Sequence, residues 1–307
     1  MLRVVRAALP TLLPLLLAAC ATTPARLHQA SPAESFTLFA DDSAPESDWN
    51  QRLIDPLTAP YLFESPVIDS QVRPVLIRHW FPTSGIFGGG RVDIAAVQLR
   101  LALTERLAFI AVKDGRAEFE PHAGPDQSGT IDVAGGLKYA LLDDPQAGTL
   151  VTAGLTYEND AGDTDILQGG SHGAWRPFLA GAAEGDEYDV LWNVGWFRPV
   201  SDHEAADYLD WHLHCSWETG TPWRPLVEVN GIHYTRNGDG LPIDVDGLDY
   251  TNIGSQDVKR ADWITGALGV RYRLTEDVDL GLAYERPLTQ RDDIFDDRIQ
   301  MDAVIRF

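Results

Sequence analysis

The chain has 307 residues, with 24 basic and 46 acidic side chains and a formal net charge of −22. The first twenty residues hold Arg3 and Arg6 and no acid, so the charge without them is about −24 (22 basic against 46 acidic). This acidity argues against nucleic acid or an anionic surface as a partner.

Residues 1–19 have the pattern of an export signal: two arginines, then an apolar run ending in Leu-Ala-Ala before Cys20. The run is interrupted by Pro10 and Pro14 and is shorter than the roughly 20 apolar residues that a membrane-spanning helix needs. The cleavage point resembles the lipobox of bacterial lipoproteins. That resemblance implies that Cys20 is acylated, and Ala21 after it favours the outer membrane. The alternative is an ordinary signal peptide with an incidental cysteine.

Residues 20–60 are rich in Ala, Ser, Thr, Pro and acids and show no sustained period, so they are predicted to form a flexible periplasmic tether. Residues 61–71 mix apolar and acidic side chains. They are expected either to lead the chain into the next domain or to form a small plug at its periplasmic mouth.

From residue 72 onward the pattern is that of β-strands with one apolar face. In residues 264–274, for example, Ile264, Leu268 and Val270 alternate with polar or small residues. The expected strands are 72–82, 92–103, 107–114, 131–141, 148–158, 174–184, 188–199, 208–218, 224–234, 263–274, 278–287 and 298–307. The first contains Pro74 and is the weakest, so ten or fourteen strands remain alternatives.

The connections separate a membrane barrel from a soluble sandwich. If the first strand rises from the periplasm, the connections on that side are short, as at 104–106 and 275–277. Those on the other side are longer, as at 115–130, 159–173 and 235–262. Short turns, long loops and strands of about 9–11 residues are typical of transmembrane β-barrels. We therefore predict an all-β fold: an antiparallel up-and-down barrel of about 12 strands over residues 72–307.

The last strand and the tryptophans support this prediction. Apolar side chains occupy alternate positions at the C-terminus: Ile299, Met301, Ala303, Ile305 and Phe307. An alternating strand ending in Phe307 resembles the signal that the barrel-assembly machinery reads in outer-membrane proteins. The resemblance implies a bacterial outer-membrane location with the C-terminus in the periplasm. Aromatic girdles are expected at the strand ends, from Trp175 and Trp263 on the outer side and from Trp217, Trp223 and Phe307 on the inner side.

The opposite strand faces are predicted to line the lumen with nearly balanced charge. The basic residues are Arg100, Lys138, Arg271, Arg273, Arg298 and Arg306, and the acidic ones are Asp132, Glu228, Asp279, Glu285 and Asp302. A balanced set can line a narrow aqueous channel, or it can pair across the interior and fill it, because desolvated charges need partners. The sequence leaves both readings open.

Two further groups are weaker candidates for sites. His212, His214 and Ser216 share the lumen face of one strand, close enough to share a metal ion or a proton. Outer-membrane hydrolases that use His and Ser on a barrel act at the lipid-facing wall, so polar lining is the preferred reading. The longest loop carries Asp239, Asp244, Asp246 and Asp249 among glycines, a partial resemblance to a calcium loop without its closing Glu. The alternative is an acidic surface that meets lipopolysaccharide through divalent cations.

The leading hypothesis is a narrow passive pore for a small solute, with no cofactor unless calcium binds the outer loops. The second is a structural or surface-interaction barrel with a filled lumen. The third is a membrane-embedded hydrolase, which requires His212, His214 and Ser216 at a surface that lipid can reach.

Overall fold

The fold is an antiparallel β-barrel, described in a computed structural model for residues 36–39, 52–170, 172–200, 205–291 and 293–307. The expected signal peptide, Cys20 and most of the expected tether lie outside these residues. The strands are β1 (Gln71–Trp80), β2 (Gly90–Thr104), β3 (Leu107–Lys113), β4 (Arg116–Pro121), β5 (Gln127–Thr130), β6 (Ala134–Asp144), β7 (Thr149–Glu158), β8 (Ala174–Glu184), β9 (Tyr188–Pro199), β10 (Asp207–Trp217), β11 (Trp223–Arg236), β12 (Asp262–Arg273), β13 (Val278–Pro287) and β14 (Asp297–Arg306).

The barrel wall contains twelve of these strands, which confirms the predicted strand number. Each pairs with its neighbours in the chain, and β1 pairs with β2 on one side and β14 on the other, so the sheet closes. In the closing pair Gln71 lies opposite Arg306 and Trp80 opposite Asp297. Closure satisfies main-chain groups that an open edge would expose to lipid.

β4 and β5 form a hairpin that the sequence did not predict. Residues 115–130 were expected to be an irregular loop, but β4 pairs with the start of β2 and with β5. The break between β3 and β4 falls at Gly115, whose φ of 122° is rarely adopted by residues with a side chain. The hairpin prolongs the sheet beyond β3 rather than adding to the twelve-stranded wall.

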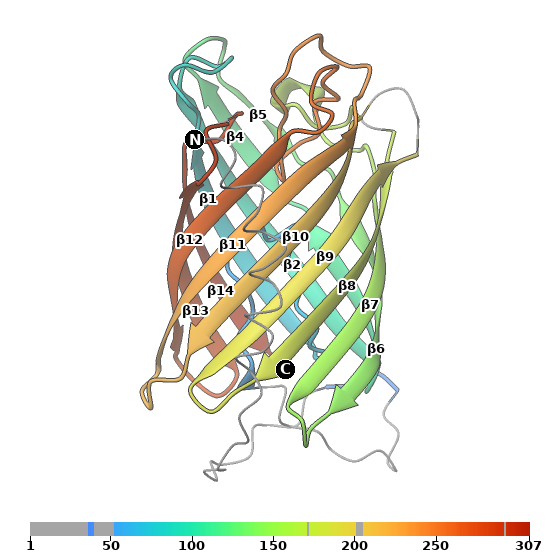
Figure 1. Ribbon diagram of the computed structural model, residues 1–307, viewed down its shortest axis with the longest axis vertical. Coiled ribbons are helices and arrows are strands. Elements are labelled where there is room, and N and C mark those ends of the chain that lie inside the picture. Colours follow the sequence, from blue (N-terminus) through green and yellow to red (C-terminus); the bar gives the residue numbers. More distant parts are fainter. Residues whose placement is uncertain (1–35, 40–51, 171, 201–204, 292) are drawn as a thin grey trace.

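The two ends of the barrel differ as expected (Figure 1). Short turns join strands at the end that also holds the C-terminus, which we call the turn end. The opposite loop end carries the β4–β5 hairpin, the segment 159–170 with the short helix η3 (Thr164–Ile166), and the long loop 237–261. Among the described residues, no helix is long and apolar enough to cross a membrane.

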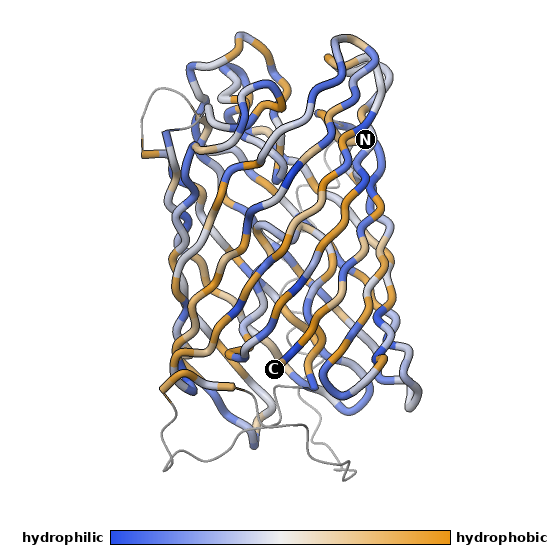
Figure 2. Tube along the Cα trace, turned by 180° about the vertical axis from the view of Figure 1, so that it is seen from behind, coloured by the Kyte–Doolittle hydropathy of each residue, from blue (hydrophilic) through white to orange (hydrophobic). Residues whose placement is uncertain are grey.

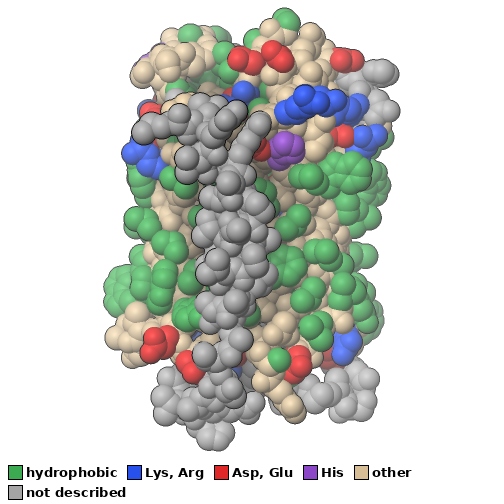
Figure 3. All heavy atoms as spheres, viewed as in Figure 1, with side chains coloured by type: hydrophobic (Ala, Val, Ile, Leu, Met, Phe, Trp, Pro, Cys, Tyr) green, Lys and Arg blue, Asp and Glu red, His purple; other side chains and the backbone are tan. Residues whose placement is uncertain are grey.

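The outer wall is apolar across its middle. Burial alternates residue by residue along most strands, and Figure 2 shows hydrophobic and hydrophilic positions alternating along the chain. In Figure 3 hydrophobic side chains are the main coloured type at mid-height of the visible wall, and charged ones lie toward its two ends. This is the surface that a transmembrane barrel presents to lipid.

The aromatic girdles are only partly as predicted. Trp175, Trp217, Trp223 and Phe307 have exposed side chains near strand ends. Trp263 is different: it is buried inside the barrel and its ring packs on that of Phe295 at 5.2 Å. The prediction placed Trp263 by its position along the strand and overlooked that it shares the inward face with Thr265.

The interior is occupied by residues 53–70, which we call the interior segment. All of them are buried except Glu64 and Ile68, which are half-buried. Leu53 and Phe63 pack against Leu150 and Leu191 of the wall. The expected boundary at residue 60 is therefore too late, because residues 53–60, assigned to the tether, lie inside the barrel with residues 61–70.

The outward apolar face predicts a depth-dependent cost for a charge. Leu282 is exposed at the middle of β13, and Leu274 is exposed at the turn end. We expect Leu282→Arg to lower the free energy of unfolding in lipid vesicles by about 2–4 kcal/mol and Leu274→Arg by about 0–1 kcal/mol. Urea titrations of the two variants measure this difference. Equal losses would contradict a lipid-facing belt.

Candidate functional site

The lumen is the candidate site, and its wall is polar because alternate strand residues face inward. Most of the predicted lumen charges lie on this face. Arg100, Lys138, Arg271, Arg298, Asp279, Glu285 and Asp302 are all buried. Arg273 is part-exposed at the turn end and bonds Asp279 at 3.0 Å.

The lumen charges form ion pairs with one another. Asp302 accepts from Arg271 at 2.8 Å and from Arg73 at 2.6 Å. Asp279 accepts from Arg306 at 2.8 Å. Of the two readings that the balanced charge left open, the described state matches the filled lumen.

The interior segment is held largely through its main chain. Arg271 Nε donates to the carbonyl oxygen of Asp55 at 2.7 Å, and Gln98 Nε2 donates to that of Pro60 at 2.8 Å. The remaining carbonyl contacts within 3.0 Å are Arg73 to Pro56 (2.7 Å), Arg176 to Leu62 (2.7 Å), Asn193 to Glu64 (2.9 Å) and Lys138 to Ser65 (2.7 Å).

Glu228 of β11 is the main acceptor for this segment. Its carboxylate receives the main-chain N–H groups of Leu57 at 2.8 Å and Thr58 at 2.7 Å, together with the Thr58 hydroxyl. It also bonds Nδ1 of His214 at 2.7 Å. A buried carboxylate is costly unless it is satisfied, and here the interior segment supplies three of the four partners.

Arg100 of β2 joins three acidic side chains of the segment. Its guanidinium lies 2.7 Å from Asp69, 3.1 Å from Glu64 and 3.3 Å from Asp55. Lys138 of β6 adds a 2.7 Å ion pair to Glu64. The wall at this level is therefore locally basic, although the lumen as a whole is nearly balanced.

His212, His214 and Ser216 lie inside the barrel, on the face that the alternation predicts. His212 bonds Asn230 at 2.8 Å and Asp210 at 3.0 Å, and its ring stacks on Phe63 with centroids 5.1 Å apart. Within the described residues, His214 Nε2 and the Ser216 hydroxyl have no hydrogen-bond partner. All three residues are buried, so lipid does not reach them. This geometry is contrary to what the hydrolase hypothesis requires.

The loop 237–261 covers the loop end. Asp249 forms a two-bond ion pair with Arg298, both bonds 2.7 Å. The Tyr250 hydroxyl donates to the carbonyl oxygen of Ile166 at 2.9 Å. Asp132, predicted as a lumen charge, lies near this cover and accepts the N–H of Gly162 at 2.9 Å.

The four candidate calcium ligands do not converge. Asp246 accepts main-chain N–H groups of its own loop, and Asp249 is engaged by Arg298. Asp239 is exposed, and the carbonyl oxygen of Asp244 accepts from Arg291. Among the described residues, no three His, Cys, Asp or Glu side chains are grouped so that they could hold a metal ion.

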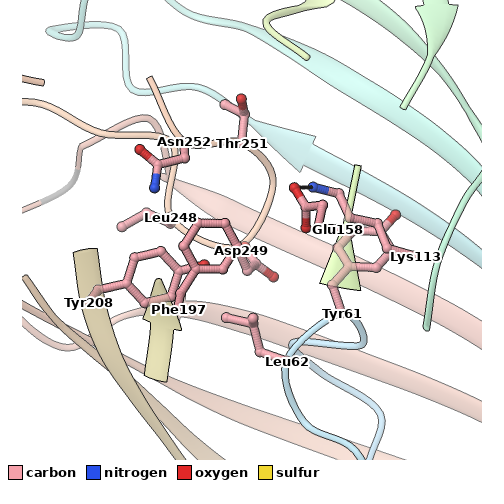
Figure 4. A pocket seen from close by; sticks show the side chains of 10 residues that line it. All are labelled: Tyr61, Leu62, Lys113, Glu158, Phe197, Tyr208, Leu248, Asp249, Thr251 and Asn252. Carbon is pink, nitrogen blue, oxygen red and sulfur yellow. Dashed lines mark hydrogen bonds and ion pairs between the residues drawn. The ribbon is translucent and has the colours of Figure 1, made fainter. Parts of the chain in front are cut away.

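A small cavity separates the interior segment from the loop cover (Figure 4). It is lined by Tyr61 and Leu62 from below and by Leu248, Asp249 and Asn252 from above, with the Lys113–Glu158 ion pair beside it. Its volume is about 10 Å³, room for about one water molecule. The cavity is too small for a solute while the interior segment and loop 237–261 are both in place.

Sequence reasoning missed several members of this site. Arg73, Gln98, Arg176 and Asn193 all bond the interior segment. Their inward positions follow the alternation, but only some of the charged residues on this face, and none of its amides, were singled out from the sequence. Nothing in the pattern indicated that the opposing groups would be main-chain carbonyls.

The barrel resembles solved outer-membrane channels. An outer-membrane channel from Pseudomonas putida F1 aligns with 83% of this chain and 100% of its own length, with a TM-score of 0.55 and 15% identity. The NanC porin aligns with 78% of this chain and 100% of its own, with a TM-score of 0.51 and 9% identity. At these identities the likeness establishes the fold. No protein-family model and no curated protein matches the sequence.

Glu228 is expected to be a major contributor to stability. In Glu228→Leu at least two buried N–H donors lose their acceptor at about 1–3 kcal/mol each, so we expect unfolding to become easier by about 3 kcal/mol. Thr152→Val is the matched control and should cost about 0 kcal/mol, since the buried Thr152 hydroxyl has no hydrogen-bond partner in the part of the chain that the structure describes. Chemical denaturation compares them. A Glu228→Leu variant as stable as the control would contradict this role.

We also expect the opening of the loop between β13 and β14 to depend on pH, because this loop contains Asp293. Burial raises the pKa of Asp293 to about 7, with Asp246 adding to the effect and Arg291 opposing it. Between about pH 4 and 7, the Asp293 carboxyl group is protonated when the loop between β13 and β14 is closed and ionised when this loop is open. A rise in pH toward 7 therefore lowers the free energy of opening the loop. Hydrogen exchange of residues 288–296 should accelerate over this range and be nearly pH-independent in Asp293→Asn, after correction for intrinsic exchange. Identical profiles would contradict the assignment.

Proposed function

We propose that this protein is a bacterial outer-membrane channel for a small polar solute, and that the interior segment closes it in the described state. The observation that carries the proposal is the chemistry of the wall beneath the segment. Gln98, Lys138 and Asn193 present polar groups that water or a solute can satisfy once the segment leaves. The similarity of the fold to outer-membrane channels supports the same proposal.

The segment is suited to leaving by the turn end. Arg52, just before it, pairs with Glu184 at the turn-end limit of β8 at 2.8 Å. Ser70, at its other limit, donates to the carbonyl oxygen of Phe36 and accepts the N–H of Ala102. Both limits lie at one end, so the segment can withdraw without threading past the loop cover. We assign this end to the periplasm, with Phe307 as the proposed assembly signal.

A barrel with a permanently filled lumen is the second candidate. The paired charges and the many contacts of the interior segment favour it. In that case the protein would act through its outer loops or as a structural element of the membrane, and its lumen would pass no solute.

Conductance in a planar bilayer separates the two. Leu57 and Phe63 are fully buried in the interior segment, so Leu57→Glu with Phe63→Glu should expel it, because an unpaired carboxylate is costly to bury. We expect the wild-type protein to be silent for long periods and the double variant to give stable conductance steps. Ile68→Glu is the control, since Ile68 is half-buried and its carboxylate can stay hydrated.

The contradicting result is equally clear. A double variant that folds, exposes its interior segment to protease and remains silent would contradict the proposal that the interior segment closes the channel, and would favour a barrel that passes no solute. Conductance that is equal in the wild type and both variants would show that the segment does not close the lumen.

A further inference from the structure

The interior segment has little internal structure of its own. Residues 53–70 form no strand or helix, and their hydrogen bonds to one another are few, such as Phe63 N to Ala59 O at 2.8 Å. Buried main-chain groups must nevertheless be satisfied. Here the wall side chains do so, and this differs from a plug that folds on itself and packs as a body.

The wall recognises both kinds of main-chain group. Carbonyl oxygens of the segment accept from Arg73, Gln98, Arg176, Asn193, Lys138 and Arg271. Two consecutive N–H groups, of Leu57 and Thr58, donate to the Glu228 carboxylate. Because every peptide carries these groups, this recognition depends little on which side chains the peptide bears.

The charged side chains of the segment are all acids. Asp55, Glu64 and Asp69 all approach the Arg100 guanidinium, and Glu64 also pairs with Lys138. These contacts are buried, where charge-assisted hydrogen bonds are strong. The lumen therefore binds negative side chains near Arg100 and Lys138, and it binds main-chain groups along the rest of the segment.

We propose that the lumen is a binding site for a short acidic peptide that turns back on itself, and that the interior segment, which turns at residues 59–63, occupies this site as an internal ligand. The inference rests on the proposed channel function and names its solute class: peptides with carboxylates placed to meet Arg100 and Lys138. An external peptide that competes with the segment would be bound by the groups that otherwise hold the segment closed.

Direct binding tests the proposal on the full-length Leu57→Glu/Phe63→Glu protein. The probe is a fluorescent synthetic peptide with the natural sequence of residues 53–69, followed by fluorescence polarisation in detergent. We expect saturable binding to the double variant. Binding to the wild-type protein should be at least about tenfold weaker, because its site is already occupied.

Three altered peptides define what is recognised. N-methylation at the positions of Leu57 and Thr58 removes both donors to Glu228 and should weaken binding at least about tenfold. Replacing the three acids by their amides should also weaken it at least about tenfold. Permuting the apolar residues with the acids kept in place should change it by less than about fivefold, since the main-chain contacts remain.

A matched protein variant tests whether Arg100 causes the preference for acidic peptides. In the double-variant background, Arg100→Gln should weaken binding of the acidic peptide and leave the amide peptide nearly unchanged. Equal binding of the N-methylated and unmodified peptides, or loss of binding on permutation, would overturn the proposal. Equal binding to wild-type and double-variant protein would place the peptide outside the lumen and overturn it as well.

A second measurement needs no displaced segment. In the wild-type protein, excess natural-sequence peptide should accelerate hydrogen exchange at Leu57 and Thr58, and the N-methylated peptide should not. Failure here and in the direct assay overturns the peptide site. Conductance without peptide binding would keep the channel and reject the peptide. Peptide binding without conductance would keep the peptide site and reject the channel.

Discussion

The contact between wall side chains and the main chain of the interior segment is the interaction on which the rest of this structure depends. A barrel of this size encloses polar and charged residues away from bulk water. The buried carboxylate of Glu228, for example, accepts the N–H groups of Leu57 and Thr58. Without these donors, and with no water in their place, it would be poorly satisfied. The segment therefore completes the polar interior, and the barrel with the segment in place differs chemically from the barrel without it.

The wall was predictable because one short-range rule governs it. Period-two alternation placed Arg271 and Asp302 inside and Met301 outside, and the structure agrees. The same rule, applied consistently, would have placed Trp263 inside with Thr265. The strand patterns predicted the number of wall strands, and the connection lengths predicted a barrel. The β4–β5 hairpin depends on a break at Gly115 that the alternation does not reveal.

The interior segment was not predictable in the same way. Residues 53–70 have neither the strand nor the helix period. Their hydrogen-bond partners in the wall are scattered along the chain: Arg73 is 17 positions away from Pro56, and Arg271 is 216 positions away from Asp55. The aspartates of the long loop show the related limit. Asp249 looked like a metal ligand among acids and glycines, but its partner is Arg298 on the final strand. Composition shows which groups need partners, and only the tertiary fold shows which partners they obtain.

The most direct measurement is the accessibility of residue 65 in the folded protein. Ser65 is buried in the interior segment, whereas Ser128 is exposed on β5. Cysteine is placed at one position or the other, and labelling by a membrane-impermeant maleimide is mapped by mass spectrometry. With the segment inside the lumen, Ser65→Cys should label far more slowly than Ser128→Cys and reach a similar rate only after unfolding. Similar rates in the folded protein would show that the segment does not fill the barrel.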